Sequence, residues 1–186
     1  MNRRAMLATL LGGGAGVVLW RNTRPAAAAP AAPPAPPKLV TVMEYSDAGV
    51  AIGLKDLPKV VKTDKEWRQQ LKPVEFDVAR RADTEIPFTG ATWNLHDTGL
   101  FRCICCDTAL FSSTTKFESG TGWPSFWAPL DTHNIVETLD TSLAEVRTAV
   151  SCRRCDAHLG HVFRDGPKPT GLRYCMNSAA MRFVKG

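Results

Sequence analysis

Short runs of apolar residues, separated by Gly and Asp, dominate the chain from Gly99 onward. Eight runs have the length and the β-branched and aromatic content of strands: 100–104, 110–111, 116–117, 135–139, 145–150, 161–164, 172–176 and 181–184. No helical segment separates these runs, which favours antiparallel pairing over alternating strand-helix-strand units. The pattern therefore predicts a mainly β domain.

Two short helices are predicted before the strands. Residues 63–66 read Thr-Asp-Lys-Glu, which is typical of a capping box, and Trp67 and Leu71 follow at helical spacing. Pro73 ends this first helix and can begin a second one. The residues of the second helix that should face the core are Val74, Val78 and Phe76.

Two segments lack a clear period. Residues 41–58 have a mixed pattern that predicts no particular element. Residues 84–93, TEIPFTGATW, contain both Pro and Gly and are therefore expected to form a loop, with Phe88 and Trp93 packed onto the core.

The first 37 residues have the order of a targeting segment. Arg3 and Arg4 precede an uncharged run over 5–20, and an Ala/Pro-rich tract covers 26–37. This order is typical of a twin-arginine signal peptide followed by an extended linker. We therefore expect a catalytic domain at 38–186 in an exported, periplasmic protein, with membrane attachment only if the N-terminal segment (1–37) is retained as an anchor.

The net charge of the chain belongs mostly to this segment. Residues 1–37 contain four Arg and no acid, so they leave +1 of the chain's +5 for residues 38–186. A nearly neutral domain argues against binding to nucleic acid or to an anionic membrane surface.

Four of the six cysteines form two Cys-x-x-Cys pairs. The pairs are Cys103 with Cys106 and Cys152 with Cys155, and each is followed by an aspartate. Two such pairs are typical of a structural zinc site, in which four thiolates leave no open position for catalysis. Six cysteines in an exported protein can instead form three disulfides. The twin-arginine route, which carries folded proteins, favours zinc.

Cys175 lies outside both pairs, in the segment Gly171-Leu172-Arg173-Tyr174-Cys175-Met176-Asn177-Ser178. In an extended strand Arg173, Cys175 and Asn177 share one face. A neighbouring cation lowers the pKa of a thiol, and the thiolate is the nucleophilic form. Cys175 is therefore either a nucleophile or a buried structural cysteine. Cys105, the other unassigned cysteine, is either a bystander or a resolving partner.

Two further groups carry candidate chemistry. His158 and His161 flank a glycine just after the second cysteine pair, and histidine can donate or accept a proton beside a thiolate. The loop 120–127, GTGWPSFW, contains Trp123 and Phe126, which can wall a binding pocket. The alternative for both groups is packing without a chemical role.

Taken together, these segments resemble the methionine-R-sulfoxide reductase B family. The resemblance covers roughly residues 67 to 184 and keeps the order of the motifs. They are FTG at 88–90, CxxC at 103–106, LF at 110–111, TKF at 115–117, SGTGWPSFW at 119–127, CxxCDAHLGHVF at 152–163 and DGPKPTGLRYCMNSA at 165–179.

The resemblance implies an antiparallel β-sheet domain with a four-cysteine structural zinc site. It implies that Cys175 attacks the sulfur of oxidised methionine in peptides or proteins and becomes a sulfenic acid. Trp123, with Phe126 beside it, would bind the substrate. The residues implied to orient or protonate the sulfoxide oxygen are His158, His161 and Asn177, while Arg173 would favour the thiolate.

One position departs from the family pattern. Members with a resolving cysteine often carry it just before the Gly-Trp-Pro-Ser-Phe segment, where this chain has Thr121. Either Cys105 resolves the sulfenic acid or an external thiol, such as a thioredoxin-like protein, reduces it directly. We favour the external thiol, because a residue within a zinc knuckle is held stiffly.

Two other functions compete with this interpretation. A zinc-ribbon-like binding module without catalysis is disfavoured by the nearly neutral domain and by export. A secreted disulfide scaffold is disfavoured by the tight spacing of four of the six cysteines.

Overall fold

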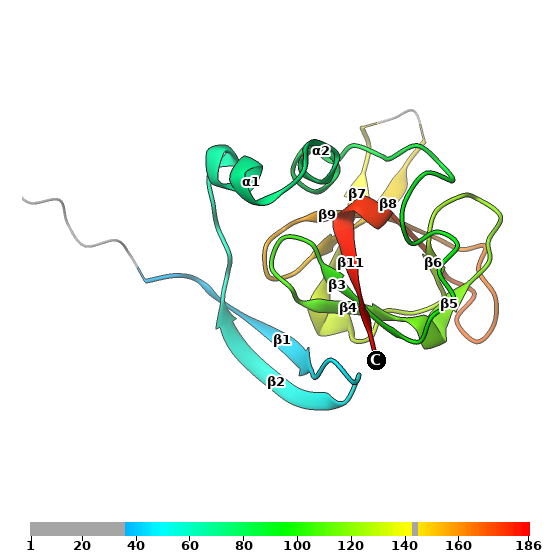
Figure 1. The fold of residues 1–186 in the computed structure, drawn as a ribbon, viewed down its shortest axis with the longest axis horizontal. Helices are drawn as coiled ribbons and strands as arrows, with labels where there is room; N and C mark the ends of the chain where they lie inside the picture. The colour runs from blue at the N-terminus through cyan, green and yellow to red at the C-terminus, as the bar shows by residue number, and fades with distance from the viewer. Residues whose placement is uncertain (1–35, 143–144) are drawn as a thin grey trace, which may run out of the picture. The chain divides into compact units, whose positions relative to one another are not determined.

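The computed structural model describes residues 36–142 and 145–186 (Figure 1). The helices are α1 (Asp64–Gln70) and α2 (Pro73–Arg81), with three short 3₁₀ turns, η1 (Ser113–Thr115), η2 (Thr132–Asn134) and η3 (Ser178–Ala180). The strands are β1 (Leu39–Tyr45), β2 (Ala51–Pro58), β3 (Gly99–Cys103), β4 (Ala109–Ser112), β5 (Lys116–Phe117), β6 (Ser125–Phe126), β7 (Ile135–Asp140), β8 (Arg147–Cys152), β9 (His158–Phe163), β10 (Arg173–Met176) and β11 (Met181–Lys185).

The strands form three antiparallel sheets. The largest has the order β5-β6-β10-β9-β8-β7, a second has the order β11-β3-β4, and β1 pairs with β2 in a separate hairpin. Figure 1 shows the two helices beyond one end of the strands and the hairpin along one side. The prediction of a mainly β, antiparallel fold with short N-terminal helices is confirmed.

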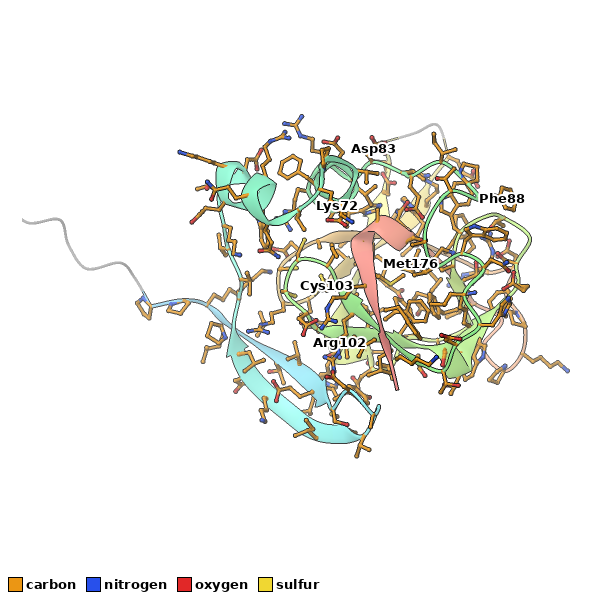
Figure 2. All side chains as sticks on the ribbon, in the orientation of Figure 1. Lys72, Asp83, Phe88, Arg102, Cys103 and Met176 are labelled. Carbon is orange, nitrogen blue, oxygen red and sulfur yellow. The ribbon has the colours of Figure 1, made fainter. Side chains whose placement is uncertain are left out.

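The core lies between the two larger sheets. Phe126 of β6 packs against Phe101 of β3 and Phe111 of β4, with ring centroids 4.8 and 4.6 Å apart. Tyr174 and Met176 of β10 are buried in the same cluster, and Met176 lies in the interior in Figure 2. Burial of these side chains fixes the face on which the alternate residues of β10 lie.

The helices begin as predicted. The Thr63 hydroxyl accepts a hydrogen bond from the Glu66 N–H, and the Glu66 carboxylate accepts one from the Thr63 N–H, which completes the capping box. Phe76 and Val78 face the core, but Val74 is 51% exposed, so that part of the prediction is wrong. Val74 is the second residue of α2, and the core does not reach this first turn.

Three strands were not predicted. β1 and β2 occupy the segment that shows no clear period, because their outer face carries exposed apolar residues such as Ile52 and Leu54. The two-residue strand β6 lies inside the loop 120–127, whose Gly and Pro residues obscure any strand pattern in the sequence.

Residues 84–93 form a loop, but Phe88 does not pack onto the core. Phe88, labelled in Figure 2, is 54% exposed and has a left-handed φ of 64°. Its ring forms a T-shaped pair with that of Trp93, with centroids 5.3 Å apart.

The predicted signal peptide lies outside the described residues, except for Pro36 and Pro37. In the part of the chain that the structure describes, no helix has both the length and the apolar character needed to cross a membrane.

The buried amide of Asn134 helps to hold the hairpin, which gives a prediction for stability. Asn134 is fully buried, accepts a hydrogen bond from the Met43 N–H and donates to the carbonyls of Met43 and Ala109. Asn134→Ala leaves these backbone groups unpaired and should lower the free energy of unfolding by about 2–4 kcal/mol. Urea denaturation measures the loss. Asn94→Ala, an exposed control, should change it by less than about 0.5 kcal/mol; equal effects would contradict the prediction.

Candidate active site and candidate metal centre

Strand β10 presents Cys175 on its partly open face. Arg173 and Cys175 are half-buried and Tyr174 and Met176 are buried, as the alternation predicts. Behind Cys175, Gly160 of β9 has a φ of 156°, and a Cβ there would lie 2.1 Å from the Cys175 carbonyl oxygen. A glycine is therefore required for β9 to approach β10 this closely.

Cys175 faces a small cavity of about 160 Å³. The cavity admits the end of one side chain, and the rest of a polypeptide has to stay outside. Its lining residues come from five segments and are Thr84, Trp123, Arg147, Gly160, His161, Phe163, Cys175 and Asn177. The Trp123 indole Nε1–H donates to the Glu85 carbonyl over 3.1 Å, which fixes the ring in the cavity wall.

Hydroxyl groups lie next to the thiol. Ser125 of β6 pairs directly with Cys175 of β10, and the Thr121 hydroxyl oxygen is 3.8 Å from the Cys175 sulfur. The Ser119 hydroxyl links the two, at 2.8 Å from Thr121 and 2.7 Å from Ser125. Thr121, at the position where family members often carry a resolving cysteine, is thus in contact with Cys175.

Burial raises the pKa of the Cys175 thiol above its ordinary value, although Thr121 and then Arg173 act in the opposite direction. Arg173 does lower the pKa of the Cys175 thiol, as expected. The pKa is nevertheless raised overall and not lowered, because the loss of water around the sulfur outweighs the effect of the nearby cation. The protonated form of the thiol is therefore favoured.

Arg173 is held by two partners. Its Nε and one terminal nitrogen donate to the two carboxylate oxygens of Asp165, at 2.9 and 2.8 Å. Its guanidinium also lies over the Phe163 ring, 4.4 Å from the centroid. The Asp165 carboxylate compensates part of the positive charge, which limits what Arg173 can do for the thiolate.

His161 lines the cavity within a charged cluster. Its Nε2 and a terminal nitrogen of Arg147 each lie 2.7 Å from the same carboxylate oxygen of Asp140. Ser142 and then His161 lower the pKa of Asp140, so this carboxylate is ionised at neutral pH. The Asp140 carboxylate therefore holds the His161 imidazole in a fixed orientation at the cavity, and a histidine side chain can donate or accept a proton.

His158 and Asn177 lie deeper than predicted. Burial is the largest cause that lowers the pKa of His158 to about 4. Its ring packs 5.3 Å from that of His161, and its Nε2 has no hydrogen-bond partner among the described residues. Asn177 lines the cavity, but its amide is already engaged, accepting from the Glu85 N–H and donating to the Leu159 carbonyl.

Phe126 is not a substrate-binding residue. Its side chain is fully buried in the aromatic core, and it is Ser125, one residue earlier, that shares a face with Cys175. Sequence reasoning also missed the cavity residues Thr84, Arg147 and Phe163 and the charged partners Asp140 and Asp165. Phe163 and Asp165 had a signal, since Phe163 ends the CxxCDAHLGHVF motif and Asp165 opens the DGPKPTGLRYC segment.

The two cysteine pairs form one cluster. The sulfur atoms of Cys103, Cys106, Cys152 and Cys155 all lie within 4.8 Å of one another, and two of the separations are 3.6 and 3.5 Å. Sulfurs bound tetrahedrally to zinc lie about 3.8 Å apart, whereas disulfide sulfurs are about 2.05 Å apart. None of the six cysteines, all within the described residues, is in a disulfide. The geometry fits a tetrahedral metal ion.

The two cysteine turns have the same local structure. In each, the residue after the second cysteine, Asp107 or Asp156, has a left-handed φ and donates its N–H to the carbonyl of the first cysteine. One turn joins β3 to β4 and the other joins β8 to β9, so a bound ion would link the two larger sheets.

Cys105 lies beside the metal cluster and outside the Cys175 cavity. It is 5% exposed, lies in the turn between β3 and β4 beside Cys103 and Cys155, and does not line the Cys175 cavity.

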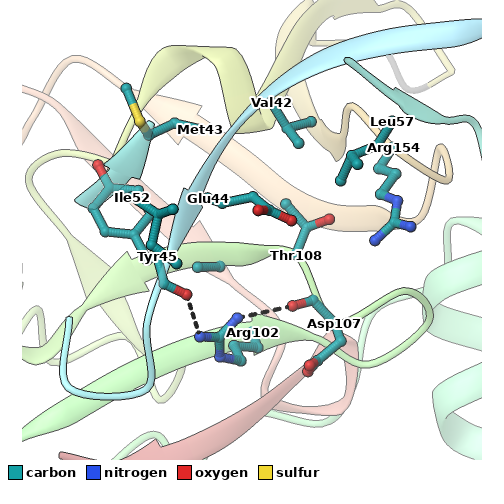
Figure 3. A pocket seen from close by; sticks show the side chains of 11 residues that line it. Val42, Met43, Glu44, Tyr45, Ile52, Leu57, Arg102, Asp107, Thr108 and Arg154 are labelled. Atoms are coloured by element: carbon teal, nitrogen blue, oxygen red, sulfur yellow. Dashed lines mark hydrogen bonds between the residues drawn. The ribbon is translucent and has the colours of Figure 1, made fainter. Parts of the chain in front are cut away.

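A second cavity, of about 140 Å³, lies under the hairpin (Figure 3). Arg102 crosses it and donates to the carbonyls of Tyr45 and Asp107. Cys175 does not line this cavity, and the role of Arg102 there is to fasten the hairpin.

Comparison with known proteins identifies the family. The SelR domain matches residues 71–185, which include the Cys175 cavity and all four clustered cysteines. The chain belongs to the methionine-R-sulfoxide reductase B family. A protein of Herminiimonas arsenicoxydans named peptide methionine sulfoxide reductase MsrB is 55% identical over 67% of this chain and 91% of its own length.

Other members of the family are similarly close. Relatives with the same name from Hahella chejuensis and Pseudomonas syringae pv. syringae are 54% and 52% identical, over 68% and 69% of this chain. The matches cover 91% and 98% of the lengths of these two relatives, so they extend over nearly the whole of each relative.

The buried imidazole gives a prediction for stability. The pKa of His158 is about 4 when folded, against 6.5 ordinarily, so the unfolded chain binds a proton first as pH falls. The free energy of unfolding should decrease between about pH 6.5 and 4 by up to about 3 kcal/mol more in the wild type than in His158→Gln. Denaturation curves across this range test it, and parallel pH dependences in the two proteins would contradict it.

Proposed function

We propose that this chain reduces methionine-R-sulfoxide in peptides and proteins with the Cys175 thiolate as nucleophile. Reduction of methionine sulfoxide follows from membership of the family; the epimer, the mechanism and the reductant are proposed. The observation that carries the mechanism is the position of Cys175 in a cavity with an indole, an imidazole and a carboxamide.

The cavity supports a role for Trp123 in binding. Its ring forms a wall beside the thiol, where it can pack against the methyl group of the sulfoxide. Because the cavity holds only a side-chain end, the substrate backbone would stay at the rim, as a residue within a polypeptide requires.

The chemical step consumes one proton. The Cys175 thiolate attacks the sulfoxide sulfur, negative charge builds on the oxygen, and His161 donates a proton to that oxygen. The substrate S–O bond then breaks as the hydroxyl group transfers to the Cys175 sulfur, so methionine is released as the thioether and Cys175 becomes a sulfenic acid. Asp140 would orient the His161 imidazole. His158 and Asn177 would act by packing and hydrogen bonding, and Arg173 would partly offset the cost of ionising a buried thiol.

An external thiol is proposed to regenerate the enzyme. Two equivalents of thiol, or one dithiol such as a thioredoxin-like protein, reduce the sulfenic acid to the thiol and release water. Thr121 occupies the position beside Cys175 and cannot form a disulfide. Cys105 lies in a metal knuckle, which supports the external route over an internal one.

We also propose that the clustered cysteines hold a structural Zn²⁺, since four thiolates at these separations suit that ion. Cys103, Cys106, Cys152 and Cys155 would saturate it, so it would stabilise the fold and take no part in the reaction. Residues 1–37 are proposed to be a twin-arginine signal and linker that delivers the catalytic domain 38–186 to the periplasm.

The first prediction concerns the nucleophile. Cys175→Ser should lower the rate of reduction of a methionine-R-sulfoxide peptide with dithiothreitol by at least about 10³-fold, because a hydroxyl is a much weaker nucleophile than a thiolate. Chromatographic separation of the two epimers measures the rate and the preference together.

Cys105→Ser is the matched control, since it removes a thiol outside the cavity, and it should keep at least half of the wild-type rate. Full activity in Cys175→Ser would refute the mechanism. A wild type without turnover of either epimer would favour a binding module.

The second prediction concerns position 121. Thr121→Cys should form a disulfide between the introduced cysteine and Cys175 after one turnover without reductant, because the Thr121 side chain already contacts the sulfur. The wild type should form none. Peptide mapping by mass spectrometry distinguishes the two; a Cys105–Cys175 disulfide in the wild type would overturn the external route.

The third prediction concerns the metal. The purified protein should contain one zinc per chain, and removal by a chelator should lower Tm by about 10 °C or more, because metal binding contributes directly to folding. Elemental analysis and thermal denaturation measure both. Less than one zinc per chain, or two oxidised cysteine pairs, would remove the claim.

A further inference from the structure

Glu85 is a buried carboxylate beside the Cys175 cavity that the mechanism does not use. It is 7% exposed, and its two oxygens accept hydrogen bonds from the N–H groups of Ser178 and Ala179, at 2.6 and 2.8 Å. These are the first residues of η3, directly after Asn177. A buried carboxylate needs hydrogen-bond donors of this kind in place of the water that it has lost.

The main chain of Glu85 contacts two residues that line the cavity. Its N–H donates to the Asn177 side-chain oxygen over 3.1 Å, and its carbonyl accepts the Trp123 indole N–H, also over 3.1 Å. One residue thus contacts the indole wall, the carboxamide wall and the backbone that continues from the nucleophile.

The following loop closes over this carboxylate. A Cβ at position 90 would lie 2.6 Å from a Glu85 carboxylate oxygen and 2.3 Å from the Ser178 hydroxyl, so only Gly90 permits the contact. Thr92 donates both its N–H and its hydroxyl to the Ser178 oxygen, which holds the covering segment in place. The lack of space for a side chain explains why the FTG motif has a glycine at position 90.

We propose that Glu85 is a positioning residue that sets the place of Trp123 relative to Cys175 and thereby the affinity for the substrate. Its carboxylate accepts hydrogen bonds from the backbone of Ser178 and Ala179, shortly after Cys175, and so anchors residues 84–86. Its main-chain carbonyl accepts the Trp123 indole N–H, and the two contacts together set the distance between the indole and Cys175. Without that anchor the carbonyl is no longer fixed and the indole loses a defined position. The inference rests on the proposed function, in which Trp123 packs against the sulfoxide methyl group.

Two substitutions in the full chain test it. Glu85→Ala removes both acceptor oxygens, and Glu85→Gln keeps the shape and one acceptor. We expect KM for a methionine-R-sulfoxide peptide to rise about tenfold in Glu85→Ala and less in Glu85→Gln, with kcat changed less than twofold. In both variants the Trp123 indole N–H, assigned by comparison with Trp123→Phe, should exchange with solvent faster than in the wild type, without substrate present.

Val42→Ala is the control for a purely structural effect. Val42 is buried in β1, away from the Cys175 cavity, so its truncation should destabilise the fold and leave KM and indole exchange unchanged. An unchanged KM and unchanged exchange in Glu85→Gln would overturn the proposal, as would an equal rise of KM in Val42→Ala. Failure of the proposed function would instead appear as wild-type turnover that does not depend on Cys175.

Discussion

The pairing of β10 between β6 and β9 decides what the rest of the molecule can do. This pairing packs Tyr174 and Met176 into the core, and the two-residue period of a strand then leaves Cys175 on the opposite face. A slip of one residue would bury the thiol and expose the aromatic ring. Burial of the apolar residues therefore fixes the direction of the Cys175 side chain, and Gly160 allows the neighbouring strand β9 to approach β10 closely.

The Cys175 cavity and the metal cluster lie in different parts of the fold. The cluster joins the turn between β3 and β4 to the turn between β8 and β9, whereas the cavity is built on β9, β10, the first residue of β8 and the loops that carry Thr84 and Trp123. None of the four clustered cysteines lines the cavity. This separation suits a structural ion whose coordination is complete, and it leaves the reaction to a sulfur outside the cluster.

Much of the fold could be predicted from the sequence, since the strands after Gly99 and both helices follow its pattern and its capping residues. The hairpin of β1 and β2 could not, because apolar residues such as Ile52 and Leu54 remain exposed there. Cys175, Trp123 and His161 were found because motifs contain them. Asp140 was missed because a single acid at the end of a strand has no pattern, and Phe126 was misplaced because β6 is too short to show one.

The central claim is that the oxygen of the substrate moves to the sulfur of Cys175. Burial raises the pKa of this thiol, so the structure by itself favours the protonated form, while His161, the proposed proton donor, and Arg173 already have fixed partners at the cavity. The most direct measurement is mass spectrometry of the protein after a single turnover with methionine-R-sulfoxide, without reductant and with a sulfenic-acid trap. The account predicts one trapped group per methionine released, on Cys175 alone. Release of methionine with Cys175 unmodified, or the trap on a clustered cysteine, would contradict it.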